Sequence, residues 1–77
     1  MTAAEAIITL LETRGGDKSI CPSEAARQLN AENWRESMPV IREAAASLEA
    51  EGRILVTQKS EIVEIAEAKG PIRLRLK

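Results

Sequence analysis

The sequence has 77 residues, with eleven Lys or Arg against twelve Asp or Glu, so its formal net charge is −1. A chain of this length buries one small core, and a balanced charge gives no general attraction to nucleic acid. We expect residues 1–77 to form a single domain. The basic residues gather at the C-terminal end: residues 1–52 hold five basic and nine acidic side chains, whereas residues 53–77 hold six and three.

Several classes of site are excluded by residue usage. One cysteine cannot form an internal disulfide, and the absence of histidine argues against the common zinc sites. The sequence contains no apolar run of about 20 residues and no glycine-rich phosphate loop. Glu5 and Glu12 interrupt the apolar segment at the start, so we do not expect a signal peptide. We therefore expect a cytoplasmic protein that is not an enzyme, with no membrane association, cofactor, metal or small-molecule substrate.

The first half of the sequence predicts two short helices. Thr2 and Glu5 have the spacing of a capping box, which predicts a helix over Ala3–Arg14. Ser19 and Ile20 predict a very short strand. The run Cys21-Pro22-Ser23-Glu24 then has a proline at the first helical position and a glutamate at the third, which predicts a second helix ending at Leu29.

A third helix is predicted by apolar residues at steps of four and three: Trp34, Met38, Ile41, Ala45 and Leu48. Pro39 would remove a hydrogen bond from a helix that began at Asn33. We therefore expect a separate helical turn at 34–36, a cap at Ser37, and a main helix over 38–51. A short helix, a tight turn and a longer helix make the helix-turn-helix arrangement.

Two strands follow the third helix. Residues 53–57 are largely β-branched and aliphatic, and residues 71–77 alternate apolar and basic side chains with a period of two. These segments predict a two-stranded antiparallel wing, with a long connection over 58–70 that includes one helical turn at 64–69. The expected fold is α+β, a winged helix of three helices followed by the wing.

The sequence also resembles a small bacterial family, domain of unknown function 3253, over nearly its whole length. The resemblance lies in the runs Ile20-Cys21-Pro22-Ser23-Glu24, Trp34-Arg35, Met38-Pro39, Glu51-Gly52-Arg53-Ile54, Val56-Thr57-Gln58-Lys59 and Gly70-Pro71-Ile72-Arg73-Leu74-Arg75-Leu76. It implies a winged-helix fold, whose superfamily mostly binds DNA. The family pattern has a glycine and a further basic residue after Lys59 and a proline near position 65. Here Ser60, Glu61 and Ile65 stand instead, so this wing is more acidic.

Two sets of basic residues are candidates for contacts to double-stranded DNA. Arg35 and Arg42 lie on the outward face of the third helix, where a winged helix meets the major groove. Glu36 and Glu43 lie beside them and would be repelled by phosphate, so a solvated face of mixed charge is the alternative. The second set comes from the wing: Arg53, Lys59, Lys69, Arg73, Arg75 and Lys77. Its alternative role is to protect an exposed sheet edge from aggregation.

The sequence thus leaves two functions open. The first is a DNA-binding winged helix, for example a small transcriptional regulator, which the basic C-terminal segment favours. The second is a protein-interaction module, in which the first helix or a strand edge docks a protein partner or a second copy. The net charge and the glutamates of the third helix favour the second. Trp34 is the only aromatic residue, so we do not expect a stacking platform for single-stranded nucleic acid.

Overall fold

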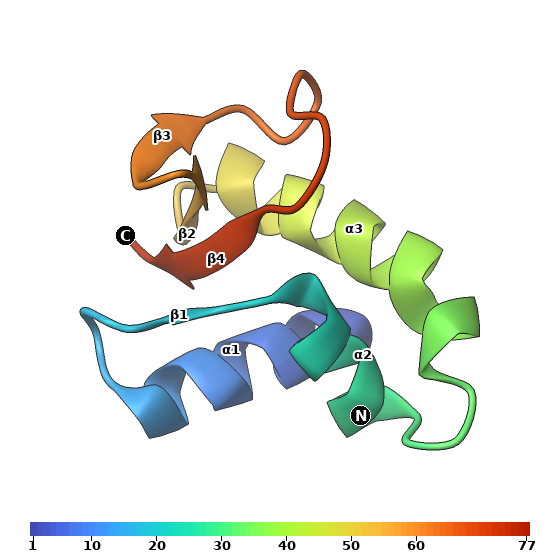
Figure 1. Ribbon diagram of the computed structural model, residues 1–77. Helices are drawn as coiled ribbons and strands as arrows, with labels where there is room; N and C mark the ends of the chain where they lie inside the picture. Colours follow the sequence, from blue (N-terminus) through green and yellow to red (C-terminus); the bar gives the residue numbers. More distant parts are fainter.

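A computed structural model describes residues 1–77 and contains three helices and four strands (Figure 1). The elements are α1 (Ala3–Arg14), β1 (Ser19–Ile20), α2 (Pro22–Leu29), α3 (Trp34–Ala50), β2 (Ile54–Gln58), β3 (Glu61–Val63) and β4 (Arg73–Leu76). The strands form one antiparallel sheet in the order β1-β4-β2-β3. The predicted α+β class is confirmed, and the arrangement is consistent with a winged-helix-like fold.

Both predicted capping boxes position their helices. At the start of α1, Glu5 N donates to Thr2 Oγ1 at 3.1 Å, and Thr2 N donates to the Glu5 carboxylate at 2.8 Å. At the start of α2, Cys21 N donates to Glu24 Oε2 at 2.7 Å, and Pro22 occupies the first turn. These bonds satisfy amides that a helix leaves free, so both helices begin where the sequence predicts.

The prediction that α3 starts in two pieces is wrong. The helix runs without a break from Trp34 to Ala50, with Asn33 at its N-terminus and Pro39 inside it. Pro39 cannot donate to the carbonyl of Arg35, but both residues are exposed, so water can reach that carbonyl. α3 is the longest helix, and none of the three has the length and apolar character needed to cross a membrane.

The sheet is larger than the predicted two-stranded wing. β2 and β4 pair as expected, with Val56 opposite Leu74, but β1 pairs with β4 and β3 pairs with β2. β3 lies in a segment that we expected to be a loop, because its three residues are too few for a strand pattern to be visible in the sequence. The helical turn that we expected next is present, closed by a bond from Ala68 N to Glu64 O.

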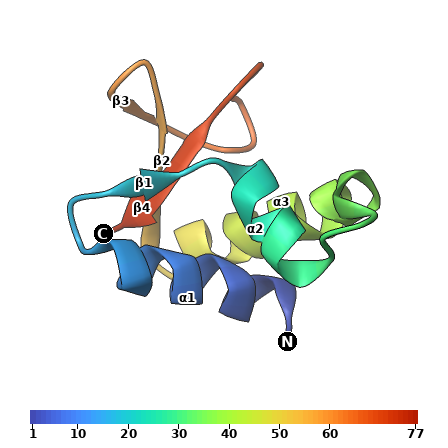
Figure 2. The same cartoon turned by 60° about the horizontal axis from the view of Figure 1, so that its bottom comes forward.

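The core lies between the three helices and one face of the sheet. α1 packs against both other helices and against β1 and β4, while the end of α3 leads into β2 (Figures 1 and 2). The predicted stripe of α3 points inward, with Ile41, Ala45 and Leu48 buried and with Trp34 and Met38 half-buried at its N-terminal end. The largest buried side chains are Ile7, Leu11, Ile20, Ile41, Ile54, Val56 and Leu74.

Candidate functional site

Three of the eight basic candidates lie together around a hollow at the open end of the sheet. This hollow, of about 580 Å³, is here called the wing cleft; it is lined by Gln58, Lys59, Glu61, Val63, Lys69, Pro71, Ile72 and Arg73. Lys59, Lys69 and Arg73 provide three positive charges against the one negative charge of Glu61. The fold therefore brings basic residues that are distant in sequence together around the wing cleft.

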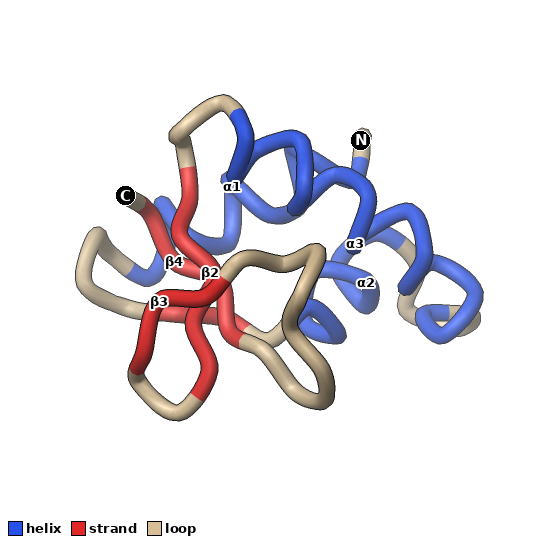
Figure 3. The backbone as a smooth tube through the Cα atoms, turned by 90° about the horizontal axis from the view of Figure 1, so that it is seen from above, coloured by secondary structure: helices blue, strands red, loops and turns tan.

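The turn between β2 and β3 places Lys59 at the tip of the hairpin. Lys59 and Ser60 connect the paired residues Gln58 and Glu61, and both have positive φ, 50° and 70°. This is the twist that two-residue hairpins require, although glycine or asparagine usually provides it. The hairpin projects beyond the helices, as Figure 3 shows from above. The side chain of Lys59 is consequently exposed at the rim of the wing cleft.

Gln58 fixes the wall of the wing cleft that the segment before β4 forms. Its side-chain amide donates to the backbone carbonyl of Lys69, and also to that of Pro71 at 3.1 Å. These bonds fix the segment before β4 against the hairpin. The ammonium groups of Lys59 and Lys69 form no hydrogen bond or ion pair within the chain, since the one ion pair joins Arg14 and Glu24. Both lysines are free to meet an anion.

Arg73 is more constrained than the two lysines. Its Nε donates to Ser19 Oγ at 3.0 Å and its Nη2 donates to Ser19 O at 3.0 Å, so it links β4 to β1. Arg75 lies two residues further along the same strand face, half-buried, with Ser19 and Leu55 as its neighbours in the flanking strands. Arg73 lines the cleft and also holds the sheet together.

The remaining predicted residues lie elsewhere. Arg53 and Lys77 are at the other end of the sheet, where Lys77 N donates to Arg53 O, and β2 spans about 13 Å between its ends. Arg35 is in the first turn of α3, at the end that points away from the sheet (Figures 1 and 2). Arg42 is half-buried two turns later along α3. The fold does not gather all eight candidates into one surface.

The outward face of α3 is poor in positive charge. Glu36, Val40, Glu43 and Ser47 follow one another at steps of four, three and four, and all four are exposed, Val40 by 46%. In a winged helix this face would approach the major groove. Two carboxylates and an aliphatic side chain there oppose close approach to phosphate, so the basic wing cleft is the stronger candidate site.

Two basic residues with defined contacts were not singled out from the sequence. The first is Arg27, whose guanidinium lies 4.6 Å from the ring centroid of Trp34; that of Arg35 lies 4.7 Å from the same centroid, and both are cation–π distances.

The second is Arg14, which forms an ion pair with Glu24. Its hydrogen bond holds the pKa of the Glu24 carboxyl below the ordinary value of 4.5. No spacing rule links Arg14 to Glu24, because a turn and a strand separate them.

Comparison with known proteins identifies the family. The model of the family described as Protein of unknown function (DUF3253) matches residues 1–77, so the chain belongs to this family and the predicted resemblance is confirmed. A search of curated proteins gives no match.

Proposed function

We propose that this member of the DUF3253 family binds double-stranded DNA through the phosphate backbone, with the wing cleft as the principal contact. The observation that carries the proposal is the grouping of Lys59, Lys69 and Arg73 around one hollow at the end of a projecting hairpin. Phosphate contacts of lysine and arginine supply most of the affinity of non-specific DNA binding. The helix-turn-helix made by α2 and α3 and a role as a small cytoplasmic transcriptional regulator belong to the same proposal.

The charges of the molecule determine how it would approach a duplex. With Glu36 and Glu43 exposed on α3, the wing leads the approach and α3 stays at a distance from the phosphates. A wing-first contact with three or four phosphates gives weak binding with little reading of base sequence. The net charge of −1 adds no long-range attraction, so the contact depends on the local positive field of the cleft.

The proposal is tested by fluorescence anisotropy with a labelled random-sequence duplex at low salt. Lys59→Gln and Lys69→Gln are each compared with Lys18→Gln, which removes the same charge from an exposed turn outside the cleft. We expect each cleft variant to weaken binding by about three- to tenfold and the control to change it by less than about twofold. Equal effects of all three substitutions would mean that the cleft has no special role.

These lysine variants isolate the cleft better than substitutions in β4. Replacing Arg73 would also break its two hydrogen bonds to Ser19, so a loss of binding could come from a disturbed sheet. The lysine side chains have no partner in the folded chain, and their removal leaves the hairpin and its Gln58 contacts in place. A change in affinity in these variants therefore reports on the contact with DNA.

A further inference from the structure

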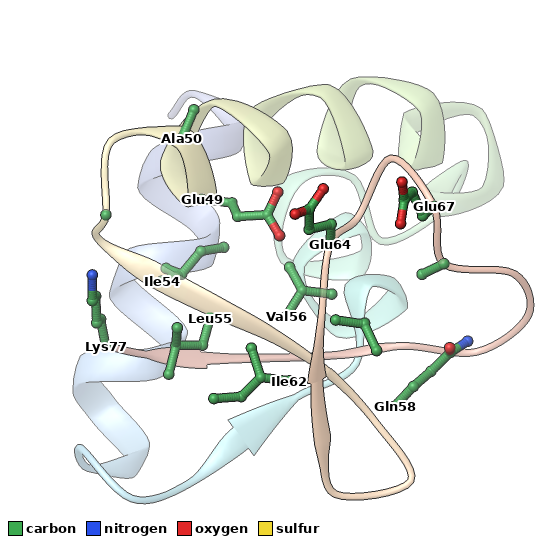
Figure 4. Close-up of a pocket in the computed structure, with 13 residues that line it drawn as sticks. Glu49, Ala50, Ile54, Leu55, Val56, Gln58, Ile62, Glu64, Glu67 and Lys77 are labelled. Carbon is green, nitrogen blue, oxygen red and sulfur yellow. The ribbon is translucent and has the colours of Figure 1, made fainter.

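A second hollow lies between the end of α3 and the strands β2 and β3. We name it the α3–β2 hollow; its volume is about 820 Å³, and its lining includes Glu49, Ile54, Leu55, Ile62, Glu64 and Glu67. Figure 4 shows aliphatic side chains of β2 and β3 beneath the glutamates of α3 and of the segment after β3. Ligand sites combine an apolar floor with a few polar groups in this way.

β3 does not extend to the N-terminal end of β2. β3 pairs with β2 from Gln58 to Val56 and ends at Val63, so Ile54 has no partner on that side. Lys77 N donates to Arg53 O, so Arg53 and Lys77 form a hydrogen-bonded pair of the β2–β4 ladder. Hydrogen-bonded pairs alternate along an antiparallel ladder, so the N–H and C=O of the next residue, Ile54, point away from β4. The residue that could have continued β3, Ile65, donates its N–H to Glu49 Oε2 instead. Ile54 is only 1% exposed, so this edge is covered, and a segment bound in the hollow must be held by side-chain contacts.

The charge of the hollow is negative at its rim. Glu64 and Glu67 are exposed there and form no ion pair, and Glu49 is held by the N–H of Ile65. The one cation in the lining, Lys77, lies at the far end of the hollow from Glu67 (Figure 4). The glutamates and the apolar floor are thus complementary to a segment that carries both positive and aliphatic side chains.

We infer that the α3–β2 hollow docks an extended segment of a partner protein in which lysine or arginine alternates with aliphatic residues. The aliphatic side chains lie on Leu55 and Ile62, and the cations reach Glu64 and Glu67. Alternate side chains of an extended segment point to opposite sides, which suits a floor and a charged rim of different chemistry. This site adjoins the wing cleft, with which it shares Gln58 and Val63 in its lining, and it does not depend on DNA binding.

The test uses nuclear magnetic resonance on the ¹⁵N-labelled full chain. The probe is a short synthetic peptide of alternating valine and lysine with blocked ends, and the matched probe has glutamate in place of lysine. We expect the lysine peptide to shift the amide signals of Ile54, Leu55, Ile62, Glu64 and Ala68, and the glutamate peptide to leave them in place. Glu64→Gln/Glu67→Gln should weaken binding by about three- to tenfold, since each exposed ion pair contributes modestly. The matched control, Glu36→Gln/Glu43→Gln, should bind as the wild type does.

Four outcomes would overturn the inference. The first is an absence of shifts up to saturating peptide, and the second is an equal response to the two peptides. The third is a set of shifts confined to other surfaces, such as the outward face of α3. The fourth is a change of the hollow's signals with protein concentration alone, because a second copy of the chain would then be its occupant.

Discussion

The carboxylate of Glu49 accepts a hydrogen bond from the backbone N–H of Ile65 at 3.1 Å, which fastens the segment after β3 to the end of α3. This contact shapes both proposed sites. It draws the chain away from β2 after Val63, so that Ile54 has no partner in β3, and the same segment returns through Lys69 to form a wall of the wing cleft.

Removing the Glu49 carboxylate should loosen this segment. We expect Glu49→Ala to lower the free energy of unfolding by about 1 kcal/mol, because a hydrogen bond to a charged group is lost at a half-buried position. The backbone amide of Ile65 should also exchange faster with deuterium. Glu43→Ala, on the exposed face of α3, serves as the control and should change stability by less than about 0.5 kcal/mol. An unchanged exchange rate at Ile65 would show that the bond does not hold the segment.

The core register of α3 is tested at Leu48. This side chain is 2% exposed and belongs to the buried cluster of the core. We expect Leu48→Ala to cost about 2 to 5 kcal/mol of the free energy of unfolding, a large fraction of what a small domain has. Urea denaturation followed by circular dichroism measures it. A cost under about 0.5 kcal/mol would contradict the placement of this face in the core.

Replacing Ser60 by glycine should stabilise the protein. Its φ of 70° is a conformation in which a side chain is strained and glycine is not. We expect Ser60→Gly to raise the free energy of unfolding by about 0.5 to 1 kcal/mol, the relief of strain exceeding the entropy that glycine adds to the unfolded chain. The same substitution at Ser47, exposed within α3, should lower stability by about 0.5 to 1 kcal/mol. Destabilisation at both positions would refute the assigned turn.

The ion pair between Arg14 and Glu24 predicts that the stability of the fold falls at low pH. Its hydrogen bond, assisted by the N–H of Cys21, lowers the pKa of Glu24 below the ordinary value of 4.5. A carboxyl with a lowered pKa in the folded state stabilises the fold above its unfolded pKa, and this stabilisation is lost as the pH falls through the folded pKa. The backbone N–H of Thr2 lowers the pKa of Glu5, so Glu5 also stabilises the fold at neutral pH and loses this effect in acid.

The measurement is the urea midpoint between about pH 7 and about pH 3. The wild type should lose stability below pH 4.5, and Glu24→Gln should lose less over the same range because position 24 no longer titrates. Parallel curves for the two proteins would show that the pair contributes nothing to folding.

Short-range signals predicted most of the fold. The capping residues Thr2 and Glu24, the stripe ending at Leu48 and the alternation after Pro71 each act within a few residues, and each placed its element correctly. β3 and the unbroken start of α3 were not predicted, since tertiary contacts decide both. Val63 becomes part of a strand through its pairing with Val56, and the burial of Trp34 and Met38 favours a continuous helix over the break suggested by Pro39.

The candidate site was predictable only in part. The sequence identified Lys59, Lys69 and Arg73 as basic, but the two lysines are ten positions apart. Their meeting depends on the hydrogen bonds from Gln58 across the cleft to the carbonyls before β4. The α3–β2 hollow was invisible because Glu49 and Glu64 come from different elements and follow no motif.

The salt dependence of DNA binding tests the central claim most directly. Anisotropy titrations of a random duplex at several salt concentrations give the slope of log Kobs against log salt, which reports the number of phosphates neutralised. For a contact through Lys59, Lys69 and Arg73 we predict a slope of about −3, falling to about −1 in Lys59→Gln/Lys69→Gln. An absence of binding at low salt, or the same slope in the variant and the wild type, would contradict a DNA contact through the wing cleft.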